Sequence, residues 1–442
     1  MFWSDRPEIA RWATPRQLRR SGLFASQGLI LGEHRRRRLC DNGTAHALLV
    51  ATTGAGKTTC FAYPNLLTWR ESVCIFDPAE ELYPDTAGWR RQFSWVVKLS
   101  PMSSAAQRYN LLDSIPLGTD GEVEAVQLLS DAMTDPSGTG ADKRSGANEH
   151  FTAMARKALQ ALLLYGLHTQ RATSLGAMLP LLMSRPSFQD HLRAWSRYPH
   201  RVIREAAWAV SQAGEQDERG GIITTLSRAL ELYADPRIQR ATDTSDFTLH
   251  DLRERARPMT LYLSIPPGQQ ERLRPWLRIV LRQLLDYTTA KLDGWRWKLW
   301  YFFDEFQTLG RVLTVSQMLN YARKFGVRFI LITPSMEALV DAFGIHHPFF
   351  EACALKLAYG IEDPKVARLL SQRLGETEVQ RWKPLGRGRG VWEKVREPLL
   401  SETALLNQPP QQAVVIAGTR KVLARKTYYK DDPVLLRRSL CS

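Results

Sequence analysis

Residues 45–59 read Ala-His-Ala-Leu-Leu-Val-Ala-Thr-Thr-Gly-Ala-Gly-Lys-Thr-Thr, and this stretch decides the fold. The apolar run at 45–50 predicts a buried β-strand that leads directly into a glycine-rich turn. A strand, such a turn and a following helix together cradle phosphates, because the N–H groups of the turn and the positive end of the helix dipole point at the anion. We therefore expect a nucleoside triphosphate to bind at this turn.

Individual residues of the turn have predictable roles. Gly54 and Gly56 allow the backbone to curl, the Lys57 ammonium reaches the β- and γ-phosphates, and the Thr58 hydroxyl holds Mg²⁺. The first glycine of the usual pattern is replaced by Ala51. ATP and Mg²⁺ are the expected cofactors, and the residues expected to bind the nucleotide are Thr53, Gly54, Ala55, Gly56, Lys57, Thr58 and Thr59.

The second half of the expected site lies far downstream. Residues 299–305, Leu-Trp-Tyr-Phe-Phe-Asp-Glu, form an apolar strand that ends in two carboxylates. We expect Asp304 to bind the magnesium shell through water and Glu305 to polarise the water that attacks the γ-phosphate. Taken alone, this pattern also fits a strand that ends in an ordinary acidic turn. Paired with Lys57, it favours an ATPase that carries its own catalytic base.

The composition of the chain indicates which kinds of molecule it is expected to bind and in which compartment. The chain has 442 residues, a formal charge of +15 and an isoelectric point near 9.7. This charge favours a polyanion, either nucleic acid or an anionic membrane face, although an arginine-rich proteome would produce the same balance. The five cysteines show no metal-binding spacing and indicate a reducing cytosol. No apolar run approaches the ~20 residues of a membrane helix, and the first residues lack the apolar core of a signal peptide.

The order of the expected elements predicts an α/β fold with a central, mostly parallel sheet. Strands are expected at 45–50, 72–77, 94–99, 259–265, 299–305, 327–333, 354–359 and 413–417. Between 121 and 251 the pattern is helical, with helices at 151–168, 172–185, 201–214 and 221–232 and a surface loop at 135–146. Residues 1–120 plus 252–442 are therefore expected to form one discontinuous nucleotide-binding domain, interrupted by an all-α domain at 121–251. Residues 381–397 are expected to hold a flexible basic loop.

Many short motifs in the right order resemble those of the type IV coupling proteins, the TraG/TraD-like ATPases of bacterial conjugation and type IV secretion. The resemblance spans nearly the whole sequence. The motifs that carry it are Arg11–Pro15 with Gly28–Gly32, Asp77-Pro78 with Glu81, Arg108–Asp113, Leu232–Arg237, Met259–Pro267, Asp304–Phe306 with Leu309-Gly310, Tyr359-Gly360 with Asp363-Pro364, Pro398–Leu400 and Ala424–Lys426.

The resemblance implies a RecA-like P-loop motor domain with an all-α domain, assembled as a homo-hexamer. It implies binding of DNA, expected to be single-stranded, or of a relaxase–DNA complex, and delivery to type IV secretion channel components at the inner membrane. The all-α domain would recognise this cargo. It also implies an arginine supplied in trans by a neighbouring subunit. Arg323 is the first candidate and Arg328 the second, against the alternative that either lies on a solvated helix face.

Two departures from the family pattern bear on function. Family members usually begin with membrane-spanning helices, whereas this chain shows none, so we expect a cytoplasmic protein held at the inner membrane by a partner. Pro334 stands where the family commonly has a glutamine that senses the γ-phosphate. A lesser departure is Ala79, where a lysine is common.

Several basic or aromatic groups are candidate DNA contacts, because a motor that grips DNA needs charge rather than base recognition. The basic candidates are Arg35–Arg38, Arg387, Arg389, Lys421, Arg425 and Lys426, each of which also fits an ordinary solvated surface. Base stacking is conceivable for Trp295, Trp297 and Trp300, although packing at the start of a buried strand is favoured.

Two other functions remain open at the level of sequence. One is a recruitment adaptor that binds ATP mainly to assemble and passes protein cargo to a secretion channel. The other is a soluble DNA-pumping ATPase of the chromosome-partitioning kind.

Overall fold

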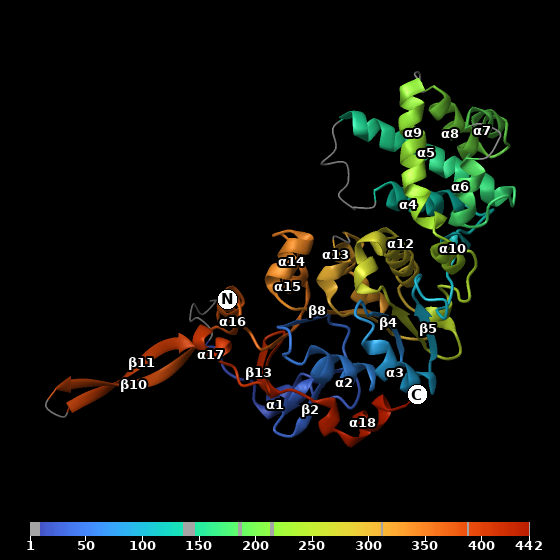
Figure 1. Cartoon of the computed structure of the whole chain (residues 1–442). Helices are drawn as coiled ribbons and strands as arrows, with labels where there is room; N and C mark the ends of the chain where they lie inside the picture. The colour runs from blue at the N-terminus through green and yellow to red at the C-terminus, as the bar shows by residue number, and fades with distance from the viewer. Residues whose placement is uncertain are drawn as a thin grey trace.

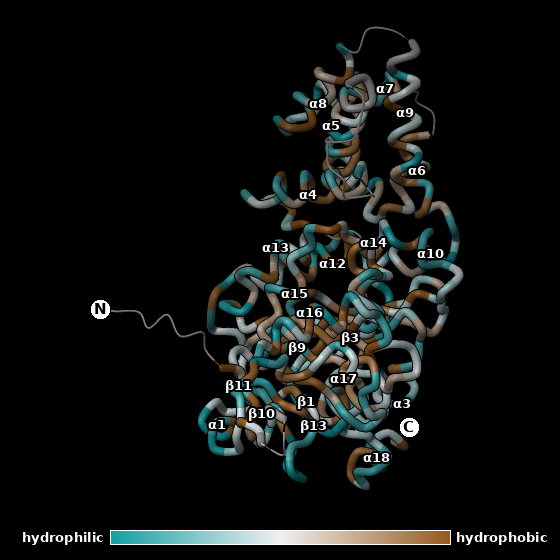
Figure 2. The backbone as a smooth tube through the Cα atoms, turned by 90° about the vertical axis from the view of Figure 1, so that its left-hand side faces the viewer, coloured by the Kyte–Doolittle hydropathy of each residue, from teal (hydrophilic) through white to brown (hydrophobic). Residues whose placement is uncertain are grey.

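The computed structural model of the chain describes residues 9–135, 146–183, 188–212, 216–310, 313–386 and 389–441. An α/β body contains both halves of the expected nucleotide site, and a group of helices stands on one side of it (Figure 1). The two parts are also separate in the view of Figure 2, in which hydrophobic segments gather inside the body around β3 and β9.

One 11-stranded sheet forms the body, with the strand order β2-β1-β13-β12-β9-β3-β8-β7-β4-β6-β5. This confirms the predicted α/β class. Its strands are β1 (Leu29–His34), β2 (Arg37–Asp41), β3 (Ala47–Ala51), β4 (Ser72–Phe76), β5 (Trp95–Leu99), β6 (Met259–Leu263), β7 (Leu299–Phe303), β8 (Val327–Thr333), β9 (Leu355–Tyr359), β12 (Gln412–Ala417) and β13 (Arg420–Arg425).

The sheet is parallel from β9 to β5 and antiparallel on its other side, where β12, β13, β1 and β2 follow. Apart from the half-buried edge strand β5, the parallel strands are buried on both faces, which explains their largely apolar sequences. Because parallel strands end at the same edge of a sheet, the segments after β3, β4 and β7 lie together. The strands on both sides of the helical segment therefore form a single sheet.

Two hydrophobic cores cover the two faces of this sheet. Leu48 and Val50 of β3 point into one core, and Leu49 and Ala51 point into the other, as the period of two requires. Helices α2 (Tyr63–Leu66), α3 (Leu82–Arg91) and α18 (Pro433–Ser439) cover one face (Figure 1). Helix α12 (Gln270–Thr288) packs against the other, and its Trp276 and Leu281 are fully buried.

The segment between β5 and β6 contains only helices among its described residues. They are α4 (Glu122–Thr134), α5 (Gly146–His168), α6 (Leu175–Met183), α7 (Phe188–Ser196), α8 (Arg201–Ser211), α9 (Gln216–Glu231), α10 (Pro236–Thr242) and α11 (Asp251–Glu254). The four helices expected from sequence correspond to α5, α6, α8 and α9, while α4 and α7 were not expected. The expected loop at 135–146 falls almost entirely outside the described residues.

The remaining helices are short, and their buried side chains, such as Leu18, Leu339 and Val366, belong to the two hydrophobic cores. They are α1 (Pro15–Arg20), α13 (Leu313–Met318), α14 (Met336–Phe343), α15 (Phe349–Ala352), α16 (Pro364–Leu374) and α17 (Glu402–Leu406). None of the helices within the described ranges is long and apolar enough to cross a membrane.

The flexible basic loop within 381–397 was expected at 385–390, between strands. Two strands flank this point, and residues 387–388 between them lie outside the described residues. Strands β10 (Glu376–Gly386) and β11 (Arg389–Pro398) pair as an antiparallel hairpin that extends away from the body (Figure 1). Trp382 and Trp392 face each other across the ladder, with ring centroids 5.5 Å apart. Arg381 pairs with Glu397 across the strands at 2.5 Å. Such cross-strand pairs stabilise a ladder, and sequence composition alone does not reveal them.

The favoured interpretation of Trp300 as a core residue is confirmed. Its ring is 2% exposed and stacks on Trp69 with centroids 3.8 Å apart. The indole N–H groups of Trp295 and Trp297 donate to backbone oxygens of Lys291 and Arg255. All three tryptophans therefore contribute to packing at the start of β7.

We predict that Trp300→Ala lowers the free energy of unfolding by about 3–5 kcal/mol, because it leaves a large cavity beside Trp69. Trp208→Ala is the matched control, since Trp208 is 66% exposed on α8, and we expect a change within about 0.5 kcal/mol. Urea unfolding of both variants measures the difference. Equal losses would contradict the assignment of Trp300 to the core.

Candidate nucleotide-binding site

The phosphate-binding turn follows β3 in a strained conformation that only glycine adopts freely. Gly54 and Gly56 have φ angles of +78° and +89°, and a Cβ on Gly56 would lie 3.0 Å from the Cys60 sulfur. Residues Thr58–Ala62 then wind as a π-helix before α2 begins. Such wide turns inside helices are rare and often occur at functional sites. The predicted order of strand, loop and helix is present.

Two contacts hold the turn from the side of β9 and β13. The Thr52 hydroxyl donates to the Gly360 carbonyl at 2.6 Å, and the Lys426 ammonium donates to the Ala55 carbonyl at 2.8 Å. Gly360 lies so close beneath the turn that a Cβ there would be 3.0 Å from Ala55 Cβ. The loop is therefore shaped before any ligand binds, which reduces the entropy lost on binding.

Lys57 and Glu305 meet in space, as the sequence predicted. Lys57 Nζ lies 2.6 Å from Glu305 Oε1, and their side chains are 11% and 30% exposed. The Gln307 amide donates to the other carboxylate oxygen of Glu305. Glu305 itself has a left-handed backbone with φ of +47°, a conformation that costs a non-glycine residue energy and often marks functional positions.

Two more carboxylates lie beside this pair. Asp304 follows β7 and Asp77 follows the neighbouring strand β4. Burial, together with the charges of Glu305 and Asp77, raises the pKa of Asp304 to about 7. Burial also raises the pKa of Asp77 to about 6, although the N–H groups of Glu81, Leu82 and Tyr83 each bond to it at 3.0 Å.

This arrangement suits a divalent cation. Carboxylates crowded in a buried place repel one another, and a cation beside them stabilises their ionised forms. Thr58 and Asp304, the predicted magnesium residues, come from opposite halves of the sequence and lie at the same edge of the sheet. Magnesium prefers one or two protein oxygens together with water and phosphate oxygens, which these residues can provide.

Comparison with known proteins identifies the family. The model of the family "Type IV secretory system Conjugative DNA transfer" matches residues 11–439. This chain belongs to that family.

Relatives and solved structures agree with the family. The conjugal transfer protein TraG of Escherichia coli is 25% identical over 97% of this chain and 78% of its own length. Protein VirD4 of Rhizobium radiobacter is 24% identical over 97% of this chain and 64% of its own length. The plasmid coupling protein TrwB, solved with ADP and Mg²⁺, superposes with a TM-score of 0.70 at 19% identity, covering 96% of this chain and 94% of that one.

The two arginines considered for a role in trans have very different surroundings. Arg328 is 2% exposed, bonds to Asp41 at 2.7 Å and donates to the carbonyls of Asp41 and Gly43. Because this side chain is buried and paired within its own chain, it cannot reach a neighbouring subunit's site, and the expectation for Arg328 was wrong. Arg323 is exposed in the turn Ala322–Phe325 that precedes β8, at the edge of the sheet opposite to Lys57.

Pro334 lies where the family pattern places a sensor side chain. It follows β8 and lines a small cavity with Ala51, Thr52 and Gly360, beside the base of the phosphate-binding turn. Its ring offers no hydrogen-bond donor toward a phosphate.

Four of the nine basic candidates for DNA contact are paired through their side chains within the protein. Lys426 is 4% exposed and supports the phosphate-binding turn, so its assignment to DNA was wrong. Lys421 donates to the Leu374 carbonyl, Arg38 pairs with Asp432 at 2.5 Å, and Arg425 pairs with Asp431 at 3.3 Å. Arg35 and Arg36 form the exposed turn between β1 and β2. Arg387 lies outside the described residues, as does the side chain of Arg389.

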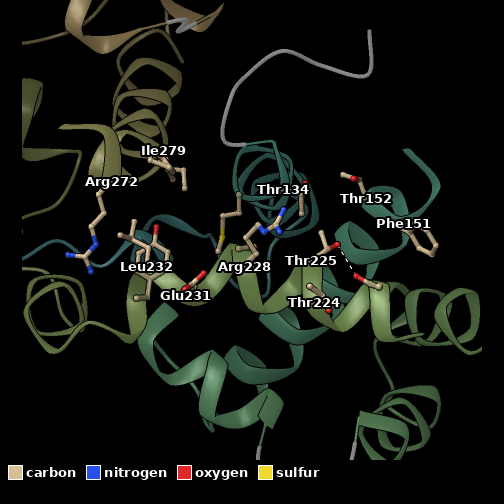
Figure 3. A pocket seen from close by; sticks show the side chains of 15 residues that line it. Thr134, Phe151, Thr152, Thr224, Thr225, Arg228, Glu231, Leu232, Arg272 and Ile279 are labelled. Carbon is tan, nitrogen blue, oxygen red and sulfur yellow. Dashed lines mark hydrogen bonds between the residues drawn. The ribbon is translucent and has the colours of Figure 1, made fainter. Parts of the chain in front are cut away.

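A separate cavity of about 860 Å³ lies where the helical segment meets the body. Figure 3 shows its walls, which come from α4, α5 and α9 on one side and from α12 on the other. Polar and charged side chains contribute to them, including Thr225, Arg228, Glu231 and Arg272. None of the residues predicted to bind nucleotide lines this cavity.

Three residues of the site escaped the sequence analysis. Asp77 had a usable signal, because it ends a buried strand that could be expected to neighbour β7. Gln307 lies two residues after Glu305 and had no distinguishing pattern. Lys426 comes from a strand more than 350 residues away from the turn that it supports, and no local sequence signal indicates that contact.

We predict that Asp304→Asn stabilises the nucleotide-free protein in EDTA, and that this gain grows as the pH rises from about 4 to about 7. In wild type the folded pKa of Asp304, about 7, exceeds the unfolded value near 4, so folding binds a proton in this window. The wild-type protein therefore loses stability as the pH rises from about 4 through the folded pKa of about 7. Above that pKa, the stability difference between Asp304→Asn and wild type stays constant. Urea unfolding at pH 5, 6 and 8 measures it, with the exposed Asp293→Asn as control. A pH-independent difference would contradict the raised pKa.

Proposed function

We propose that this protein is an ATP-hydrolysing coupling protein that binds DNA or a relaxase–DNA complex and delivers it to a type IV secretion channel. The observation that carries the proposal is the 2.6 Å contact between Lys57 and Glu305, which joins the phosphate-binding turn to the carboxylates after β7. Family membership supplies the conjugative context. The net charge of +15 supports a polyanionic cargo.

With ATP and Mg²⁺ bound, the Lys57 ammonium would contact the β- and γ-phosphates in place of Glu305. The backbone N–H groups of Thr53–Thr59 would hold the phosphates, and Thr58 and Asp304 would hold the ion, which would offset the negative charge of the phosphates. The released Glu305 carboxylate, oriented by Gln307, polarises the attacking water. The ion pair of the nucleotide-free protein thus keeps the catalytic base neutralised until a triphosphate competes for the lysine.

We predict that Lys57→Ala abolishes ATP binding, whereas Glu305→Gln retains binding and stops hydrolysis, because it removes only the base. Steady-state ATPase with and without single-stranded DNA, together with equilibrium nucleotide binding, measures both effects. Glu337→Gln, an exposed carboxylate change, is the control. Normal turnover by Glu305→Gln would rule out Glu305 as the base. If DNA does not stimulate ATP hydrolysis while ATP still drives assembly, the result would instead support the alternative function, a recruitment adaptor for protein cargo.

We also propose that the protein acts as a homo-hexamer in which Arg323 completes the neighbouring subunit's site. Arg323 is exposed at the edge of the sheet opposite to its own Lys57, so it cannot reach its own turn. In a ring, the sheet edge that carries Arg323 could face the phosphate-binding turn of the next subunit. Arg323 would then lie near that subunit's γ-phosphate, where an arginine stabilises transition-state charge.

Mixing two inactive variants tests this arrangement. Subunits with Arg323→Ala keep an intact phosphate-binding turn, and subunits with Lys57→Ala keep an intact Arg323. In a mixed assembly the second kind of subunit can supply its arginine to the first, so we expect the mixture to recover part of the ATPase activity. Lys324→Ala, the adjacent exposed change, should leave activity near wild type. Failure of the mixture to recover, when both variants assemble, would contradict a role in trans.

The helical segment at 121–251 is proposed as the unit that recognises cargo, since its described residues include none of those around Lys57. The cavity between α9 and α12 supports this proposal, because it offers Arg228 and Arg272 at the junction with the motor.

We predict that Arg228→Glu weakens DNA or relaxase binding while leaving the basal ATPase rate unchanged. Replacing a cation by an anion reverses the local interaction with phosphates. Fluorescence anisotropy with labelled single-stranded DNA measures binding, and Arg193→Glu, an exposed arginine on α7 away from the cavity, is the control. Unchanged binding by Arg228→Glu would show that cargo does not use this cavity.

A further inference from the structure

Three helix ends of the inserted segment converge on one cluster of polar side chains. Glu122 is the first residue of α4, His168 is the last residue of α5, and His200 caps the start of α8. His168 Nε2 lies 3.2 Å from one oxygen of the Glu122 carboxylate, and His200 Nε2 lies 2.8 Å from the other. One nitrogen or oxygen atom from each of the three residues lies within 4.8 Å of the other two.

This geometry is close to that of a tetrahedral metal site. Zinc binds imidazole nitrogen and carboxylate oxygen at about 2.0–2.1 Å, which places neighbouring ligand atoms about 3.3 Å apart. The two nitrogen–oxygen distances, 3.2 and 2.8 Å, run to different oxygens of the Glu122 carboxylate and differ from that separation by at most about half an ångström. The three ligand atoms all lie within 4.8 Å of one another. Small rotations of the three side chains would therefore admit an ion between them.

We propose that Glu122, His168 and His200 bind one Zn²⁺ ion, with water as the fourth ligand. Two imidazoles and one carboxylate form a donor set that zinc uses when it keeps an open position. The side chains of His168 and His200 are 24% and 20% exposed, so an ion and a water molecule can enter. The Glu122 side chain is 8% exposed and is already oriented by the Gly118 N–H at 2.7 Å. This inference does not rest on the proposed function.

The ion would fix the place where the helical segment leaves the body. Glu122 begins the first helix of the segment, so a metal bond to it ties that start to the ends of α5 and α8. Metal binding to a folded site stabilises the fold by mass action. We therefore expect Zn²⁺ to raise the thermal unfolding midpoint, independently of nucleotide.

The surroundings of His200 indicate how strongly the site is expected to bind Zn²⁺. The Nδ1 atom of His200 is buried and has no hydrogen-bond partner in the described part of the chain. Metal-bound histidines usually donate this N–H to an acceptor, and loss of such a partner weakens binding by roughly 10–100-fold. Moderate affinity is therefore expected, below that of closed structural zinc sites.

The test uses the full chain, freed of metal and nucleotide with EDTA and then desalted. Competition between the protein and a chromophoric chelator for Zn²⁺ is expected to show one ion per chain. Glu122→Gln, His168→Ala and His200→Ala should each weaken binding by more than about 100-fold, because each removes a direct ligand. Glu124→Gln, on the same helix, and His250→Ala, an exposed histidine, should bind as wild type.

Cobalt substitution distinguishes this site from the five cysteines of the chain. A nitrogen and oxygen site gives visible bands of tetrahedral Co²⁺ without a thiolate charge-transfer band. Absence of stoichiometric binding, unchanged affinity in all three variants, or a thiolate band would each overturn the proposal. If circular dichroism shows that a variant does not fold, X-ray absorption of the zinc-loaded wild type replaces it as the test. We expect a zinc ion bound by two imidazole nitrogens and by oxygen. Sulfur ligands, or no zinc at the cluster, would overturn the proposal.

Discussion

The contact between Lys57 and Glu305 is the constraint on which the rest of the structure depends. It requires the carboxyl ends of β3 and β7 to lie at one edge of a single sheet, although 248 residues separate the two side chains in sequence. The order β3-β8-β7-β4 satisfies this requirement, because β8 separates β3 from β7 by only one strand. Asp77 at the end of β4 then joins the same group of charges. A sheet in which β3 and β7 lay several strands apart would separate the lysine from the acids.

The position of the helical segment follows from the same sheet. It leaves after β5 and returns before β6, and these two strands are neighbours at one end of the sheet. The segment is a crossover between two parallel strands: it leaves at the carboxyl end of β5 and returns at the amino end of β6. Because both strands lie at one side of the sheet, the insertion does not disturb the central buried strands. The cluster of Glu122, His168 and His200 lies within this segment, and the cavity lined by Arg228 and Arg272 lies at its junction with α12.

The parallel strands and the two halves of the site could be predicted from sequence for a simple physical reason. Strands buried on both faces need unbroken apolar runs, and a phosphate-binding turn needs glycine at positions such as Gly54 and Gly56. Strand β2, at the antiparallel side, begins with Arg37 and Arg38 and gave no such signal. The strands β10 and β11 were not among the expected strands, because their stability comes from cross-strand pairs such as Trp382 with Trp392. Lys426 was considered as a DNA contact or a solvated residue, and its contact with Ala55 could not be expected because it exists only in the folded sheet.

The most direct test of the account is a structure of the assembled protein with Mg²⁺ and a non-hydrolysable ATP analogue. The account predicts that Lys57 Nζ leaves Glu305 and contacts the β- and γ-phosphates, while Thr58 and Asp304 approach the ion and Glu305 faces a water beside the γ-phosphate. A nucleotide bound elsewhere, or a bound triphosphate with the Lys57–Glu305 pair unchanged, would contradict it.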